Sequence, residues 1–435
     1  MNILIQALQL ILALSILVVI HELGHYFFAR LFKVKVEKFY LFFDPWFALF
    51  RYKPKNSDTE FGVGWLPLGG YVKIAGMIDE SMDKEQMKQE PQPWEFRTKP
   101  AWQRLLVMAG GALFNIILAF IIYAMVLFTW NDTFLPPKNA TMGMEFSQVA
   151  LDAGFRNGDI LLSIDGRELE RIVPAVIFNI SRANQVTVLR DGQEVQIAIS
   201  EDFFRNLMTS DERFFTLRVP TVVASIIEDS AAEKAGLMAG DSIVSVNGVM
   251  IPTLVDFRNE LAKYKNELIK VAYYRDNVLQ TTIVQVDSEG GIGFVPRSLQ
   301  WVTKRYNFFQ AFPAGVRLGI QTLRNYIYQF RYIFTREGAT SLGGFGTIGG
   351  LFETQWDWHW FWMMTALLSI ILAFMNLLPI PALDGGHIMF LLYEVISGRK
   401  PNEKFQEYAQ IAGMIFILGL LLWANGLDIF RAITG

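Results

Sequence analysis

Two histidines and a glutamate stand close together near the start of the chain, at the end of a long apolar run: His21, Glu22 and His25. In a helix, residues four apart lie on one face, so both imidazoles can reach one metal ion. Glu22 lies beside them, within reach of a water held by that metal. Ionisable groups at the end of an apolar, membrane-length helix are costly and usually functional. The pattern predicts a metal site for hydrolysis; the alternative is a pair of histidines that only pack at a membrane boundary.

A third metal ligand has to come from a short list of residues. Catalytic zinc usually takes three protein ligands and leaves one position to water. The chain has four histidines and no cysteine, which excludes thiolate ligands and disulfides. The stretch NLLPIPALDGGH, from Asn376 to His387, offers Asp384 and His387, and His359 is a less suitable candidate. The residue chemistry leaves this choice open. The two prolines of the stretch must interrupt a helix, and such backbone is tolerated at membrane depth only where it is buried or lines a cavity.

Membrane-spanning helices are the elements expected to position these groups. Hydrophobic residues make up 52% of the 435, and the net charge of -3 gives no sign of a nucleic-acid partner. No basic segment precedes the first apolar run and no small-residue cleavage site follows it, so we expect it to be retained. Lysine and arginine gather between the first and second runs and between the third and fourth. These connections are therefore predicted to be cytoplasmic, with both termini outside. Each run is long enough to cross a bilayer: Asn2 to Ile20, Leu105 to Phe128, Trp358 to Leu383, and Tyr408 to Leu427.

An internal repeat occupies the region between the second and third runs. AGFRNGDILLSIDGREL, starting at Ala153, matches AGLMAGDSIVSVNGVMI, starting at Ala235. Each copy contains a hairpin signal, Asp-Gly at 165–166 or Asn-Gly at 247–248, followed by a helix candidate and closing strands. The helix candidates are Ile172 to Arg182 and Thr253 to Tyr264. The pattern resembles tandem PDZ domains, and the alternative is two generic small β domains that serve as spacers.

The remaining stretches carry weaker signals. Glu60 to Gly76 is rich in glycine and strand formers, so we expect a hairpin or loop there. Asp79 to Glu90 reads as a charged, exposed connector, and Phe312 to Phe334 as an amphipathic helix at a surface or membrane interface. The glycine-rich Leu342 to Gly350 lacks the Lys-Ser/Thr ending of a phosphate loop, so nucleotide binding is not expected.

Together the motifs carry a resemblance to a known family. His-Glu-x-x-His on the first span, N-x-x-P-x-x-x-L-D-G on a later span and a PDZ pair between the second and third spans resemble the site-2 protease family. The resemblance implies that Asp384 completes a zinc (Zn²⁺) site with His21 and His25. It implies that Glu22 is the general base and that His387 is a neighbour of the site.

The resemblance also implies substrate-binding residues. GVGWLPLGGYVK is similar to the family's re-entrant β-loop, which pairs with an unfolded substrate strand and here includes Gly62, Gly64, Trp65 and Leu66. GALFN ends in Asn115 and is similar to a G-P-x-x-N motif, although Ala112 replaces the usual proline. Asn376 is implied to contact the substrate backbone or the tetrahedral intermediate. The alternative for Asn376 is an amide that caps the broken helix.

The predicted fold is an α-helical polytopic membrane protein with four transmembrane helices, two extracytoplasmic PDZ-like α+β domains and a membrane-associated β-hairpin loop. The expected segments are a first transmembrane helix at 1–32, a cytoplasmic-side region at 33–103 with the β-loop at 60–76, a second transmembrane helix at 104–130, PDZ domains at 135–219 and 220–298, an amphipathic helix with a glycine-rich connector at 305–350, and transmembrane helices at 358–395 and 406–430.

The predicted function is intramembrane zinc proteolysis. The resemblance implies a bacterial inner membrane, with the PDZ domains and both termini periplasmic and the active site toward the cytoplasm. It implies membrane-spanning substrates, namely a pre-trimmed anti-sigma factor in an envelope stress response or remnant signal peptides, with PDZ domains that gate access. The alternative is a catalytically idle PDZ adaptor, for which the four site residues would have no reason to coexist. A transporter is disfavoured because the four spans show no inverted repeat.

Overall fold

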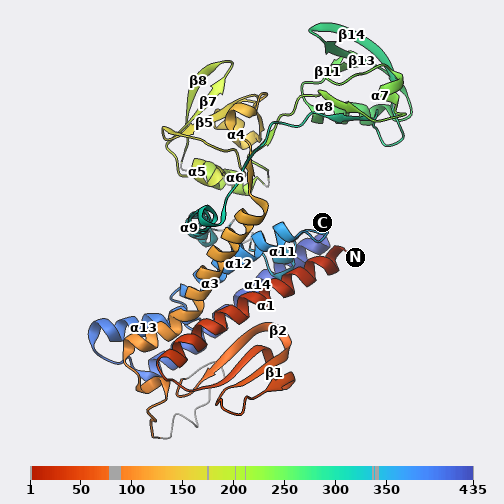
Figure 1. Cartoon of the computed structure of the whole chain (residues 1–435). Coiled ribbons are helices and arrows are strands. Elements are labelled where there is room, and N and C mark those ends of the chain that lie inside the picture. The colour runs from red at the N-terminus through yellow and green to blue at the C-terminus, as the bar shows by residue number, and fades with distance from the viewer. Residues whose placement is uncertain are drawn as a thin grey trace. The chain divides into compact units, whose positions relative to one another are not determined.

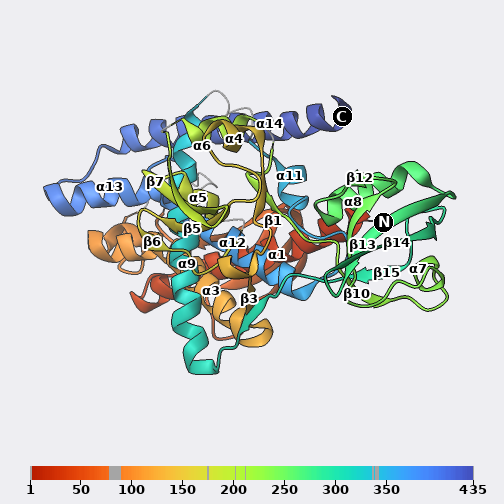
Figure 2. The same cartoon turned by 90° about the horizontal axis from the view of Figure 1, so that it is seen from above.

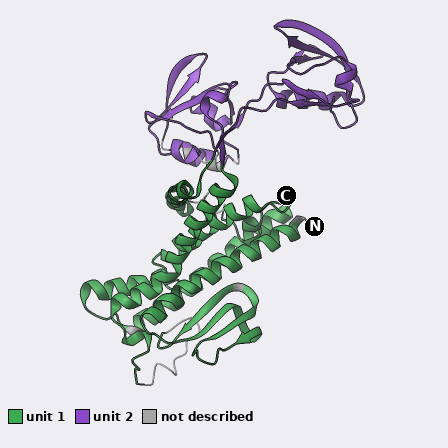
Figure 3. Cartoon of the chain, viewed as in Figure 1, with its two compact units in different colours: residues 1–131, 305–435 green, residues 132–304 purple. Residues whose placement is uncertain are grey.

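The chain divides into two compact units, which Figure 3 shows in different colours: residues 1–131 with 305–435, and residues 132–304. The computed structural model describes residues 2–77, 90–173, 176–200, 202–210, 212–335, 338 and 342–434. The connector predicted at Asp79 to Glu90 lies, apart from Glu90, outside these residues, as do positions 174–175 of the first helix candidate in the repeat.

Four helices of the first unit are long and apolar enough to cross a membrane, and they match the four apolar runs. They are α1 (Asn2–Leu31), α3 (Ala101–Trp130), α12 (Trp358–Leu377) and α14 (Glu403–Thr434) (Figure 1). Helices α1 and α3 cross at Gly24 and Gly110. A Cβ atom at Gly24 would lie 2.2 Å from the Gly110 carbonyl oxygen. Glycine is needed at this crossing because the two backbones touch there.

The third apolar run is broken, as its prolines predict. Helix α12 ends at Leu377, and α13 (Asp384–Ser397) begins after an irregular stretch that contains both prolines. Proline has no N–H to donate and its ring clashes with the preceding turn, so α12 cannot continue. Ala382 in the break has a φ of 79°, a left-handed conformation that costs a residue with a Cβ about 1 to 2 kcal/mol. The break places Asp384 in the first turn of a new helix.

Helix α9 (Phe308–Phe330) corresponds to the predicted amphipathic helix and starts four residues earlier. It packs along α3 through small residues. A Cβ atom at Gly315 would lie 2.4 Å from the backbone nitrogen of Ala124, and one at Gly319 would lie 2.5 Å from the Phe120 ring. This close helix contact occupies one face of α9.

A β-sheet formed by β1 (Val36–Tyr52) and β2 (Glu60–Ile74) lies against α1 (Figure 1). The segment predicted to be a hairpin or loop forms the single strand β2, and its partner is β1, where no strand was predicted. Residues 38–41 of β1 pair with 70–73 on one side and with 60–63 on the other. Residues 61–64 pair in addition with 48–52. The 70–74 segment therefore has one strand partner among the described residues. No strand in this part of the chain pairs with its other edge, and the Val72 N–H donates to the Glu22 carboxylate.

The glycine-rich stretch forms the short helix α11 (Phe345–Gly349), which is capped by the end of α14. The Thr347 N–H donates to Asp428 Oδ2 at 2.9 Å, and the Phe345 N–H donates to Asn425 Oδ1 at 3.1 Å. These side-chain oxygens thus accept hydrogen bonds from the backbone N–H groups that a bound phosphate would otherwise need as donors. This arrangement gives a structural role to the stretch that superficially resembled a phosphate loop.

The second unit contains the two copies of the repeat, and each copy has a four-stranded antiparallel sheet with the same strand order (Figures 1 and 2). The orders are β6-β5-β7-β8 and β12-β11-β13-β14. The strands are β5 (Ile160–Ile164), β6 (Arg167–Glu168), β7 (Gln185–Arg190), β8 (Gln193–Ala198), β11 (Ser242–Val246), β12 (Val249–Met250), β13 (Leu268–Arg275) and β14 (Val278–Gln285). Short helices complete the copies: α4 (Gln148–Asp152), α5 (Val176–Ile180) and α6 (Phe203–Thr209) in the first, α7 (Ala231–Lys234) and α8 (Leu254–Leu261) in the second.

Each copy has the predicted hairpin turn, and each has an equivalent buried Arg–Asp ion pair. Asp165 and Asn247 have φ values of 48° and 49° and are followed by glycines with positive φ, as the tight hairpin turns require. Arg190 binds the buried Asp159 at 2.7 Å, and Arg275 binds the buried Asp241 at 2.6 Å. The copies are therefore duplicates in structure as well as in sequence.

The chain enters and leaves the second unit on paired strands. β3 (Asp132–Phe134) pairs antiparallel with β16 (Val302–Lys304), and Thr133 is opposite Thr303. The first and last residues of the unit are therefore neighbours.

Candidate metal centre and catalytic cavity

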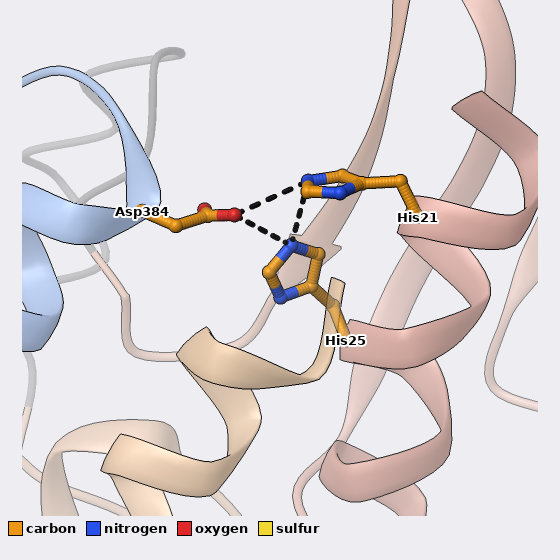
Figure 4. A group of neighbouring side chains, drawn as sticks. All are labelled: His21, His25 and Asp384. Atoms are coloured by element: carbon orange, nitrogen blue, oxygen red, sulfur yellow. Dashed lines mark hydrogen bonds and ion pairs between the residues drawn. The ribbon is translucent and has the colours of Figure 1, made fainter. Parts of the chain in front are cut away.

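Three side chains from two helices converge on one point (Figure 4). The Nε2 atoms of His21 and His25, both on α1, lie 3.2 Å apart. Asp384 Oδ2, from the first turn of α13, lies 3.2 Å from His21 Nε2 and 3.3 Å from His25 Nε2. Within the described residues, these three form the single group of potential metal ligands of this kind.

The chemistry of these three atoms fits a bound cation. His25 Nδ1 lies 2.8 Å from the Val107 carbonyl oxygen, which can only accept a hydrogen bond, so Nδ1 carries a proton. In the neutral ring, Nε2 then presents a lone pair, and Asp384 Oδ2 is a buried oxygen without a hydrogen-bond donor among the described residues. Tetrahedral ligands at zinc distances of about 2.0 to 2.2 Å lie about 3.3 to 3.6 Å from one another. The observed separations match that spacing.

A glycine on α3 makes room for the two imidazoles. A Cβ atom at Gly111 would lie 2.5 Å from His21 Cε1 and 2.6 Å from His25 Nε2. Both distances are far below van der Waals contact, so no other residue fits at this position without moving the ligands. In the sequence, Gly111 is only the first residue of the GALFN stretch and carries no other signal of this role.

The turn that carries Asp384 also depends on glycines. A Cβ atom at Gly385 would lie 1.9 Å from the Leu378 carbonyl oxygen, and one at Gly386 would lie 2.6 Å from Pro381 Cα. The two glycines after Asp384 therefore let the break fold tightly onto the start of α13. Farther along α13, Glu394 binds Arg104 of α3 at 2.5 Å, which ties this helix to its neighbour.

A cavity of about 740 Å³ opens beside the three ligands. Glu22 and Asn376 line it together with residues 69–74 of β2 and the adjoining turn. Gly70 lets β2 lie close against α1, since a Cβ atom there would lie 2.7 Å from Val18 Cγ1. Tyr71 donates to Asp44 at 2.8 Å. Burial and this hydrogen bond raise the pKa of Tyr71, so its phenol stays neutral in the cavity wall.

The structure separates the three candidates for the third ligand. Asp384 joins the histidine pair, whereas His387 lines the cavity and lies 3.4 Å from Gln410. His359 packs against Trp130, with tilted rings whose centroids are 5.5 Å apart. It stands on the same helix as Asn376 but roughly 25 Å away at 1.5 Å rise per residue.

The predicted substrate-binding residues fall into two groups. Asn376 and Leu66 line the cavity, and Asn376 Nδ2 lies 3.3 Å from His21 Nε2. Gly62, Gly64 and Trp65 are not among the cavity-lining residues. Gly62 pairs with β1 residues on both sides, and Trp65 stacks on Trp46 and Phe47 with ring centroids 5.4 and 6.0 Å away. Asn115 is also outside the lining and is fully buried behind His21.

Comparison with known proteins assigns the chain to a family. The model of Peptidase family M50 matches residues 9–420. The chain belongs to peptidase family M50. A protease RseP of Yersinia pestis is 28% identical over 97% of this chain and 98% of its own length. The metalloprotease MmpA of Caulobacter vibrioides is 27% identical over 99% of this chain and 98% of its own. A Neisseria meningitidis relative whose name places it among zinc metalloproteases is 27% identical over 98% of both chains.

Family membership agrees with the sequence-based prediction of a site-2 protease and of a peptidase. Four apolar helices in a member of this family are those of a multi-pass membrane protein.

Proposed function

We propose that this protein is a zinc endopeptidase that cleaves membrane-embedded segments of other proteins. The observation that carries the proposal is the convergence of His21, His25 and Asp384 beside a cavity that Glu22 lines. Catalytic zinc sites typically have three protein ligands and a fourth position that is open to water or substrate. When bound, zinc would polarise the scissile carbonyl and make water more acidic.

The residues of the chain have separate tasks in this reaction. Glu22 accepts a proton from the attacking water and delivers it to the leaving amine. Asn376 donates from its amide to the substrate at the rim of the metal site. It contacts His21, and no hydrogen bond in the described part of the chain joins its side chain to the broken backbone. This contact favours a substrate role over a role as a cap.

A helical substrate must unwind before it is cut, because its scissile carbonyl is bonded within the helix. We assign the replacement of those backbone bonds to residues 70–74 of β2. This segment lines the cavity and has an open edge, whereas Gly62 has strand partners on both sides. An extended substrate segment can therefore add to the sheet at 70–74.

The repeated domains of the second unit act as PDZ domains that control access, with the unit on the periplasmic side of a bacterial inner membrane. The concentration of basic residues between α1 and α3 supports this orientation. Two folded domains attached to the catalytic unit would sterically exclude a substrate whose outer domain is intact. An anti-sigma factor trimmed by another protease, or a remnant signal peptide, fits this description. The competing role is capture of a new C-terminus in a PDZ groove.

The decisive experiment compares the wild type with Glu22→Gln and with Asp384→Asn. We measure zinc content and cleavage of a reconstituted transmembrane peptide. Glu22→Gln should retain zinc and lose activity by at least 100-fold, since general acid–base catalysis contributes about 10² to 10⁴. Asp384→Asn should lose both zinc and activity. Unchanged cleavage by a zinc-containing Glu22→Gln variant would refute the mechanism.

A further inference from the structure

Asn115 stands directly behind one of the proposed metal ligands. Its side chain is fully buried, and its Nδ2 lies 3.3 Å from His21 Nδ1. Its Oδ1 is also buried and has no hydrogen-bond partner among the described residues. Unpaired buried carboxamide oxygens cost roughly 1 to 3 kcal/mol, so this atom calls for an explanation.

A metal-binding state of His21 supplies the missing partner. The Nε2 atom of His21 faces Asp384 and His25, so in the neutral ring that binds a metal through Nε2 the proton sits on Nδ1. An N–H at Nδ1 needs an acceptor. The Asn115 amide offers one when a half-turn of the amide brings Oδ1 to the side of His21, since the two ends of an amide have nearly the same shape.

The second histidine shows the same arrangement in completed form. His25 Nδ1 donates to the Val107 carbonyl oxygen at 2.8 Å. Val107, Gly111 and Asn115 are four residues apart on α3, so they share one face of that helix. On this face, Val107 holds one imidazole, Gly111 leaves space for both, and Asn115 contacts the other. In addition, Ser369 Oγ of α12 donates to the backbone carbonyl oxygen of Asn115 at 2.7 Å, which fixes this turn of α3.

We propose that Asn115 is a positioning residue of the metal site, whose amide oxygen accepts the Nδ1 proton of His21 and so turns the Nε2 lone pair toward the metal. The proposal rests on the proposed zinc site. It differs from the substrate-binding role that family resemblance implied for Asn115, because this amide is buried outside the cavity lining.

The test measures zinc affinity of the purified full chain by competition with a chelator, together with kcat and KM on a transmembrane peptide. Asn115→Ala should lower zinc affinity by about 10- to 100-fold, which is the usual effect of losing a partner behind a ligand. Asn115→Asp should keep or increase the affinity, because a carboxylate accepts the Nδ1 proton at least as well. Thr365→Ala is the matched control. Thr365 is equally buried, but its hydroxyl donates within its own helix to the Phe361 carbonyl at 2.8 Å, so affinity should not change.

The two Asn115 variants distinguish positioning from mere packing. If Asn115 only fills space, the buried charge of Asn115→Asp should weaken zinc binding more than Asn115→Ala does, and that order overturns the proposal. Wild-type zinc affinity in Asn115→Ala with a raised KM also overturns it, in favour of substrate binding. Should Asn115→Ala fail to fold, Asn115→Asp against Thr365→Ala still decides. Failure of the wild type itself to bind zinc would instead count against the proposed function.

Discussion

At the scale of single residues, the metal centre depends as much on an absent side chain as on those present. The spacing of His21 and His25, together with their place at the end of an apolar, membrane-length helix, predicted a metal site, because residues four apart lie on one face of a helix. The space that the imidazoles need could not be read from α1, since Gly111 of another helix provides it. Asp384 was one of several candidates by chemistry, and only the position of the helix break brings it to the histidines.

Replacement of Gly111 by alanine tests this dependence. The added methyl group would collide with both imidazoles, so we expect zinc affinity and cleavage to fall by at least 10-fold while the helices remain folded. Gly419→Ala in α14 is the matched control, because a Cβ atom there meets nothing within 4 Å. It should leave both properties unchanged and stabilise its helix slightly. Zinc binding to Gly111→Ala with wild-type affinity would contradict the steric argument.

At the scale of elements, local sequence rules predicted the helices and turns well and the β-sheet poorly. The four spans, the proline break and both hairpin turns of the repeat follow from apolar length, missing N–H groups and positive φ, which are all local properties. The partner of β2 was not predicted, because β1 pairs with two separate parts of β2 in a register that no local signal encodes. This register decides which backbone edge remains open at the cavity.

Proline substitutions in two outer segments of this sheet test the use of the open edge. Val72→Pro removes an N–H from the segment that lines the cavity, whereas Leu49→Pro alters the segment on the opposite side of the sheet. Both substrates lose the Val72 N–H that bonds the catalytic Glu22, but only the helical one must also exchange its backbone bonds, so we expect Val72→Pro to slow the helical substrate about 10-fold more than an already unfolded one. Leu49→Pro should affect both little. Equal slowing of both substrates by Val72→Pro argues against strand addition, and circular dichroism checks that both variants are folded.

At the scale of the whole molecule, the second unit is an insertion in the chain of the first unit. The two parts of the first unit can be joined without it. Thr133 and Thr303 are cross-strand partners, so the ends of the insertion lie about 5 Å apart. A linker of two or three residues in place of residues 132–304 can therefore join the end of α3 to the segment before α9. The metal ligands and the cavity-lining residues all belong to the first unit and remain in such a variant.

The deletion variant separates the two roles considered for the repeated domains. If they exclude bulky substrates, the variant should cleave a substrate with an intact outer domain at a rate near that for a trimmed one, whereas the full chain cleaves only the trimmed substrate. If they capture a new C-terminus, the variant should cleave the trimmed substrate more slowly, through a raised KM, and still reject the intact one. Glu22→Gln in the same background must abolish cleavage in either case, which assigns the activity to the metal site. Cleavage of both substrates at the rates of the full chain would show that the second unit controls neither selection step.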